Sequence, residues 1–130
     1  MYEAITRRIR VHVVPQFIED ESDAGEQQFV WAYTITIEND GSESVQLKSR
    51  YWRITDESGH VEEVRGPGVV GQTPHIAPGQ SFRYTSGCRL TTPSGIMVGR
   101  YQMVSDSGDE FEIEIPAFSL DSPHGKRRLN

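Results

Sequence analysis

The sequence predicts an all-β protein: an immunoglobulin-like or fibronectin-III-like antiparallel β-sandwich of about seven strands. Three observations predict it. Apolar and polar residues alternate along most of the chain, clusters of turn-forming residues separate the alternating segments, and no helix start signal is followed by a helix stop signal. A small closed barrel is the alternative architecture.

The first half of the predicted sandwich begins with a strand over residues 9–17, where apolar side chains occupy odd positions. Pro15 removes a backbone donor from this strand, so we expect an edge or bulged strand. The acidic segment 19–26 has the polarity of a hairpin loop. The strand after it is the most regular in the chain, and its odd positions should face the core: Phe29, Trp31, Tyr33, Ile35 and Ile37.

The next strand, after the turn Asn39-Asp40-Gly41-Ser42, changes parity along its length. Its apolar residues lie at odd positions up to Leu47 but at even positions from Trp52 onward. Because a slip of one residue would expose half of this apolar set, we predict a β-bulge near Lys48 to Arg50. With Trp31, Trp52 is expected to be a large core residue.

The remaining strands are shorter or less regular. A turn at residues 56–59 leads to a strand at Val61 to Val64, and a further strand opens with Phe82 and Tyr84. Apolar residues occupy both parities of 96–104, so we expect that strand to be covered on both faces. The last strand, from Phe111 to Ile115, switches parity across Pro116. We expect one domain at 1–123 and a disordered basic tail at 124–130.

Composition restricts the classes of function. The net charge of −6 argues against a general nucleic-acid binder. The single cysteine, Cys88, excludes an internal disulfide and fits a reducing compartment. No segment approaches the roughly 18 apolar residues of a membrane helix, so we expect a cytoplasmic protein that does not insert into membranes.

The segment Arg65 to Pro74 is the first candidate site, because it reads G-x-G-x-x-G. Prolines 67 and 74 leave no room for a helix after it, which excludes a dinucleotide fold. Its backbone N–H groups could still hold a phosphate, with Arg65, Gly66, Gly68 and Gly71 as the binding residues. The structural alternative is a tight connection between sheets, closed by a hydrophobic plug of Val69 and Val70.

Other candidate sites find less support. The acidic loop, at Glu19, Asp20, Glu21, Asp23 and Glu26, lacks the ligand steps of a calcium loop. The histidines at 12, 60, 75 and 124 share no ligand spacing, so we expect neither a metal site nor a cofactor. The neighbours of Cys88 could lower its pKa and His75 could act as its base, but no third group completes a catalytic set, so no catalytic residue is expected.

Protein recognition has different candidates. Tyr2, Arg50 and Tyr51 are expected as exposed contact residues, and the connections at 65–74 and 91–94 are expected to carry recognition on a rigid scaffold. The sequence identifies no partner, and a homodimer stays open.

Several motifs together resemble those of the ApaG (CorD) family: MYEAITR, WAYTITIEN, RGPGVVG, YTSGC with LTTPSG, GRYQM and IPAFSLDSP. The resemblance covers residues 1–123. Positions 8 and 89 carry Arg where the family pattern would have Gly and Pro.

The resemblance implies a fibronectin-III-like fold in a bacterial protein linked to cobalt resistance and magnesium efflux. It brings no catalytic residue, since the family has no established reaction, and related domains in larger eukaryotic proteins resemble protein-binding modules. We therefore expect a non-enzymatic binding module that acts through a protein partner. The alternative is a binder of a phosphate-containing small molecule, either pyrophosphate or a nucleotide, on the glycine segment.

Overall fold

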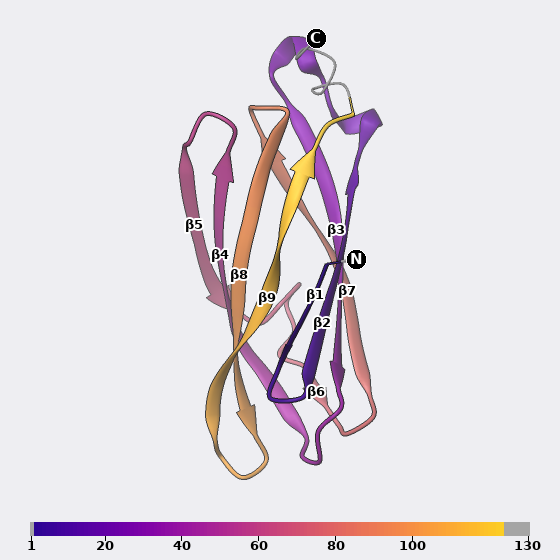
Figure 1. The fold of residues 1–130 in the computed structure, drawn as a ribbon, viewed down its shortest axis with the longest axis vertical. Helices are drawn as coiled ribbons and strands as arrows, with labels where there is room; N and C mark the ends of the chain where they lie inside the picture. Colours follow the sequence, from indigo (N-terminus) through magenta and orange to yellow (C-terminus); the bar gives the residue numbers. More distant parts are fainter. Residues whose placement is uncertain (1, 124–130) are drawn as a thin grey trace.

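Two antiparallel sheets face each other in the computed structural model, which describes residues 2–123 (Figure 1). The first sheet has the order β1-β2-β3-β7, and the second has the order β5-β4-β8-β9 with β6 paired to β4. The strands are β1 (Tyr2–Thr6), β2 (Ile9–Phe17), β3 (Phe29–Asn39), β4 (Val45–Asp56), β5 (Val61–Pro67), β6 (His75–Ile76), β7 (Ser81–Leu90), β8 (Ser94–Ser105) and β9 (Glu110–Asp121). The predicted all-β sandwich is confirmed. The predicted tail, 124–130, lies outside the described residues.

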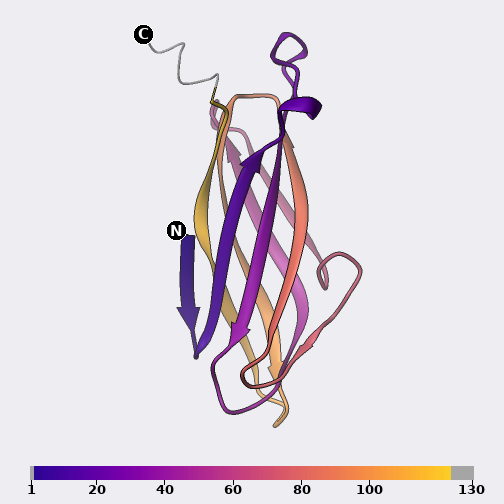
Figure 2. The same ribbon diagram turned by 90° about the vertical axis from the view of Figure 1, so that its right-hand side faces the viewer.

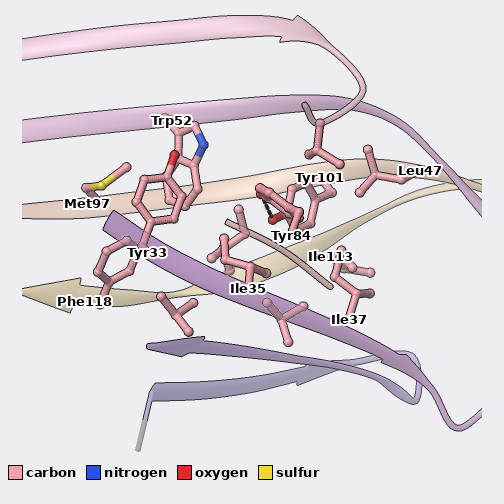
Figure 3. Close-up of a cluster of buried hydrophobic side chains, with 14 of the residues drawn as sticks. Tyr33, Ile35, Ile37, Leu47, Trp52, Tyr84, Met97, Tyr101, Ile113 and Phe118 are labelled. Carbon is pink, nitrogen blue, oxygen red and sulfur yellow. Dashed lines mark hydrogen bonds between the residues drawn. The ribbon is translucent and has the colours of Figure 1, made fainter. Parts of the chain in front are cut away.

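The core lies between the two sheets and takes one face of each (Figures 2 and 3). Alternate residues of β3 are buried from Phe29 to Asn39, as its period-two pattern predicts. Trp31 and Trp52 are 1% and 3% exposed, so both tryptophans are core residues. The rings of Tyr33 and Trp52 meet edge to face, with centroids 5.5 Å apart, which joins the two sheets.

Two bulges keep the apolar residues on the core face. The pairing of β4 with β8 shifts between Leu47 and Ser49, which confirms the predicted bulge and leaves Lys48 as the extra residue. The pairing of β8 with β9 shifts where Met97 and Gly99 stand opposite Phe118 and Ile115. This second shift is the parity change expected across Pro116.

Two expectations about the strands are wrong, and more strands form than the sequence pattern indicates. Residues 2–123 contain nine strands, because β1, which the sequence pattern did not reveal, pairs with β2, and because β6 is a two-residue strand. β2 is therefore not an edge strand, although Pro15 lies beyond Val13, the last residue of β2 that pairs with β1. β8 is covered on one face only, since Ile96 and Val98 are 50% and 44% exposed.

Two single-turn 3₁₀ segments, Glu19–Glu21 and Ala24–Glu26, lie in the connection from β2 to β3. Among residues 2–123, no helix has the length and apolar character needed to cross a bilayer.

Candidate binding face and glycine loop

The glycine segment begins as strand and ends as a small hairpin. Arg65, Gly66 and Pro67 are the last residues of β5 and pair with β4. Val69 and Gln72 then exchange two backbone hydrogen bonds, each of 2.8 Å, which places residues 70 and 71 at the tip of a two-residue turn. In Figure 2 the chain between β5 and β7 stands out to one side of the two sheets. We call residues 68–73 the glycine loop.

Arg50 fixes the start of the glycine loop. Its Nη1 donates to the carbonyl oxygens of Pro67 and Gly68, at 3.0 and 2.9 Å. A Cβ on Gly66 would lie 3.0 Å from both terminal nitrogens of Arg50, so the missing side chain gives the guanidinium room to pass. Gly68 has a φ of +59°, and a Cβ there would lie 2.1 Å from the carbonyl oxygen of Gln72. Both glycines therefore have structural reasons to be glycine.

The same contacts reduce what the loop offers to a phosphate. The N–H of Gly68 donates to the Lys48 carbonyl, while those of Val69 and Gln72 donate to each other's carbonyls. The N–H groups of Gly68, Val69 and Gln72 thus already donate hydrogen bonds within the protein, whereas an anion nest needs N–H groups that converge on a ligand. The phosphate site of Arg65, Gly66, Gly68 and Gly71 stays a prediction. Of the two valines expected as a plug, Val69 is buried at 1% exposure, but Val70 is 52% exposed.

Val70 is also strained. Its φ is +43°, a region that β-branched residues rarely enter, and Gly71 follows with a φ of +79°. Neither core packing nor turn geometry favours a valine at this tip.

The outward-facing side of the second sheet, which we call the outer face, carries a row of large polar side chains. Tyr51 on β4 pairs with Arg65 on β5 and with Arg100 on β8. The guanidinium carbons of Arg65 and Arg100 lie 4.5 and 4.2 Å from the centre of the Tyr51 ring, within cation–π distance. The Tyr51 hydroxyl donates to Glu63, and this hydrogen bond raises the pKa of Tyr51. These contacts hold both guanidiniums against one ring.

A hollow of about 310 Å³ lies beside this row. Two of its lining residues, Arg100 and Glu112, form an ion pair, with Nε and Oε2 3.2 Å apart. The lining carries three arginines and one carboxylate and consists of Ser49, Arg50, Tyr51, Arg65, Gly66, Arg100, Gln102 and Glu112.

An apolar corner lies at the other end of the outer face. Ile96 pairs across Thr55 with Val61, and Val98 occupies the next row toward Tyr51. Val61, Ile96 and Val98 are 42%, 50% and 44% exposed. The outer face therefore joins an apolar corner to a tyrosine flanked by arginines. The sequence pattern does not reveal the corner, because apolar residues at both parities of 96–104 predict a strand that is covered on both faces.

The three residues predicted as exposed contacts lie in different environments. Tyr51 lies on the outer face as expected. Tyr2 packs against the core, with its ring centroid 6.0 Å from that of Phe118. Arg50 is partly buried, and its Nη1 is engaged by the glycine loop.

Cys88 lacks the environment of a nucleophile. Burial, and secondly the charge of Glu62, raise the pKa of its thiol to about 11. The expectation that its neighbours could lower this pKa is wrong, and the thiol is protonated at neutral pH. Cys88 pairs with Trp31 in the first sheet, whereas His75 pairs with Gln46 in the second.

The predicted metal-ligand candidates do not converge. Among residues 2–123, no group of three His, Cys, Asp or Glu side chains could hold a metal ion. In the acidic loop, the Asp23 carboxylate instead accepts the N–H of Gly25, at 3.0 Å. His124 lies outside the described residues.

The comparisons with known proteins agree with one another. Residues 19–105 match the family described as the ApaG domain. The chain is 60% identical to Protein ApaG of Brucella anthropi and 57% identical to that of Parvibaculum lavamentivorans, in both cases over 100% of each chain. The crystal structure of the putative ApaA protein from Bordetella pertussis is 50% identical, with a TM-score of 0.86 over 88% of this chain and 94% of that one. The C-terminal domain of wzt, 10% identical with a TM-score of 0.52 over 93% of this chain and 77% of that one, shares the fold alone.

Proposed function

The chain belongs to the ApaG family, and we propose that it works as a non-enzymatic binding module that recognises a protein partner through the outer face. One observation carries this proposal: Tyr51 is held between Arg65 and Arg100 on a solvent-facing sheet surface. Tyrosine and arginine are enriched among the residues that dominate binding energy at protein interfaces.

The apolar corner supplies what a polar cluster alone would lack. Single exposed apolar residues are ordinary, but Val61 on β5 and Ile96 and Val98 on β8 lie within two neighbouring rows of the same sheet face. Burying such a group against a partner removes apolar surface from water, at about 25 cal/mol per Å². The row formed by Tyr51, Arg65 and Arg100 would then give the contact its specificity through charge and hydrogen bonding.

The outer face is built for binding without rearrangement. Tyr51, Arg65 and Arg100 lie on three hydrogen-bonded strands, and stacking restricts both guanidiniums before any partner arrives. Side chains that are already ordered lose less entropy on binding, which at other interfaces amounts to about 0.5–1.5 kcal/mol for each immobilised side chain.

Catalysis has less support in the described residues. The raised pKa of Cys88 leaves its thiol protonated at neutral pH, and its predicted base lies in the other sheet. The names of the matched relatives state no reaction. The proposal extends to the family's association with cobalt resistance and magnesium efflux: we expect the partner to be a transporter or a regulator of one, so that the module affects ion export without binding the ion.

Capture of partners from cells grown with and without cobalt tests this function. The bait is the full chain, compared with Tyr51→Ala, Val98→Glu and a matched control, Arg83→Ala, whose side chain is exposed on β7 in the other sheet. A captured protein is then purified, and its affinity is measured by calorimetry. We expect wild type and Arg83→Ala to bind alike, and Tyr51→Ala and Val98→Glu to bind at least about tenfold more weakly, or about 1.4 kcal/mol. Equal binding by all four proteins would reject the outer face as the recognition surface.

A separate titration tests the phosphate-binding alternative. Pyrophosphate is titrated while the amide NMR signals of residues 65–72 are followed. Signals that stay in place at millimolar pyrophosphate would end this alternative, whereas saturable shifts would establish it beside protein binding.

A further inference from the structure

The hollow beside Tyr51 is positively charged, whereas the protein as a whole is negatively charged. The whole chain has a net charge of −6, yet the hollow is lined by three arginines and one glutamate. A local excess of one sign raises the concentration of oppositely charged groups and orients them during encounter. A negatively charged group would therefore be attracted to the hollow more than a neutral one.

The three arginines differ in what they can still bind. The Nη1 of Arg50 is engaged by two carbonyls of the chain, and Arg100 is paired with Glu112. Within residues 2–123, Arg65 contacts the face of Tyr51 and forms no ion pair. A guanidinium stacked by its face keeps the N–H donors at its edge available, in the fork arrangement that suits an oxyanion.

We infer that this hollow binds the carboxylate of an acidic side chain, Asp or Glu, presented by the protein partner. Arg65 is the principal donor, and Arg100 is the second donor once the incoming carboxylate competes with Glu112. The inference rests on the proposed function and gives the chemistry of one partner contact. The size of the hollow, about 310 Å³, is at the lower end of ligand pockets and fits a single side chain better than a nucleotide.

Glu112 decides between a carboxylate and a phosphate. Its charge, 3.2 Å from Arg100, already balances part of the positive charge in the hollow. Of the two guanidiniums stacked on Tyr51, Arg100 is thus compensated by Glu112, and within the described part of the chain Arg65 is left without a compensating charge. A carboxylate carries the one negative charge that balances Arg65. A phosphate group carries close to two at neutral pH, and its second charge would lose water without gaining a partner.

The test uses the full chain and a capped peptide, acetyl-Gly-Glu-Gly amide, with the glutamine peptide as its uncharged control. The Nε–Hε NMR signals of Arg65 and Arg100 report binding directly. Because a lone carboxylate binds weakly, dissociation constants on the order of 10 mM are expected. The glutamine peptide should leave the arginine signals unmoved.

Three substitutions separate this site from general charge attraction. Arg65→Gln should weaken peptide binding by about tenfold, the typical loss for a charge-assisted hydrogen bond. Glu112→Gln removes the competing carboxylate and should strengthen binding several-fold. Arg83→Gln, an exposed arginine on β7 in the other sheet, should change little. Thermal unfolding confirms that each variant is folded, and the gain expected for Glu112→Gln does not depend on damage to the protein.

The outcomes are distinct from those for the proposed function. Unmoved Arg65 signals, equal losses in Arg65→Gln and Arg83→Gln, or tighter binding of inorganic phosphate than of the peptide would each overturn the carboxylate assignment. If partner capture still depended on Tyr51, the proposed function would stand without it. Peptide binding at Arg65 combined with capture that ignores Tyr51 would support the site and reject the proposed function.

Discussion

Alanine at Gly68 and at Gly71 should affect stability very differently, although both glycines have positive φ. Their φ values are +59° and +79°, so alanine at either position costs about 1–2 kcal/mol in backbone strain. Part of this cost, about 0.4–1 kcal/mol, is offset because alanine restricts the unfolded chain. A Cβ at Gly71 meets nothing within 4 Å. Gly71→Ala should therefore destabilise the protein by about 1 kcal/mol.

Gly68 carries an additional cost because its Cβ would lie 2.1 Å from the carbonyl oxygen of Gln72. The clash can be relieved only by opening the turn, which breaks the two hydrogen bonds between Val69 and Gln72. Their loss is worth about 1 kcal/mol each. Exposure of Val69, now 1% exposed, adds about 1.5 kcal/mol. Gly68→Ala should therefore cost about 4 kcal/mol in total.

Urea unfolding of the two variants beside the wild type measures this difference. With a slope of about 2 kcal/mol per molar urea, the midpoint should fall by about 2 M for Gly68→Ala and by about 0.5 M for Gly71→Ala. If the two variants lost equal stability, the closed turn and the plugging role of Val69 would both be incorrect.

Three further predictions concern other parts of the chain. Arg8 has a φ of +66°, so Arg8→Gly should raise the free energy of unfolding in urea by about 0.5–1 kcal/mol, and an unchanged value would contradict the strained turn. Tyr84 and Tyr101 share a buried hydrogen bond between their hydroxyls. Replacing either by Phe should cost about 1–3 kcal/mol, and the double variant should cost less than the sum because no hydroxyl is then left unpaired. The Cys88 thiol, with a pKa of about 11, should be alkylated by iodoacetamide at a rate that still rises above pH 10, whereas the thiol in urea should level off near its ordinary pKa of about 9; a folded-state midpoint near pH 7 would reopen the nucleophile hypothesis.

The sequence predicts the fold well where one face of a strand is buried. β3 alternates cleanly because its odd side chains meet the other sheet, and the bulge at Lys48 follows from the parity change between Leu47 and Trp52. The prediction that β8 is covered on both faces is wrong, because the apolar character of a residue does not show whether another part of the chain packs against it. Ile96 and Val98 have strand-forming side chains whether they face a core or a partner.

The composition of the outer face depends on the register between paired strands, which the identity of single residues does not reveal. Tyr51 and Arg65 were both singled out in the sequence, but Arg100 was not, since it lies 49 positions from Tyr51 in a strand that only tertiary pairing brings beside it. The bulge at Lys48 directs Trp52 into the core and its neighbour Tyr51 to the outside. The G-x-G-x-x-G pattern suggested a phosphate loop because its letters do not record which N–H groups are already bonded.

NMR mapping of a purified complex tests the recognition surface most directly. The isotope-labelled protein is mixed with the unlabelled partner recovered by capture, and the changes in amide and methyl signals are assigned to the two sheets. We expect changes concentrated on Tyr51, Arg65, Ile96, Val98 and Arg100 of the outer face. Changes confined to the outward side of β2, β3 and β7, with Tyr51, Arg65 and Arg100 unaffected, would contradict recognition through the outer face.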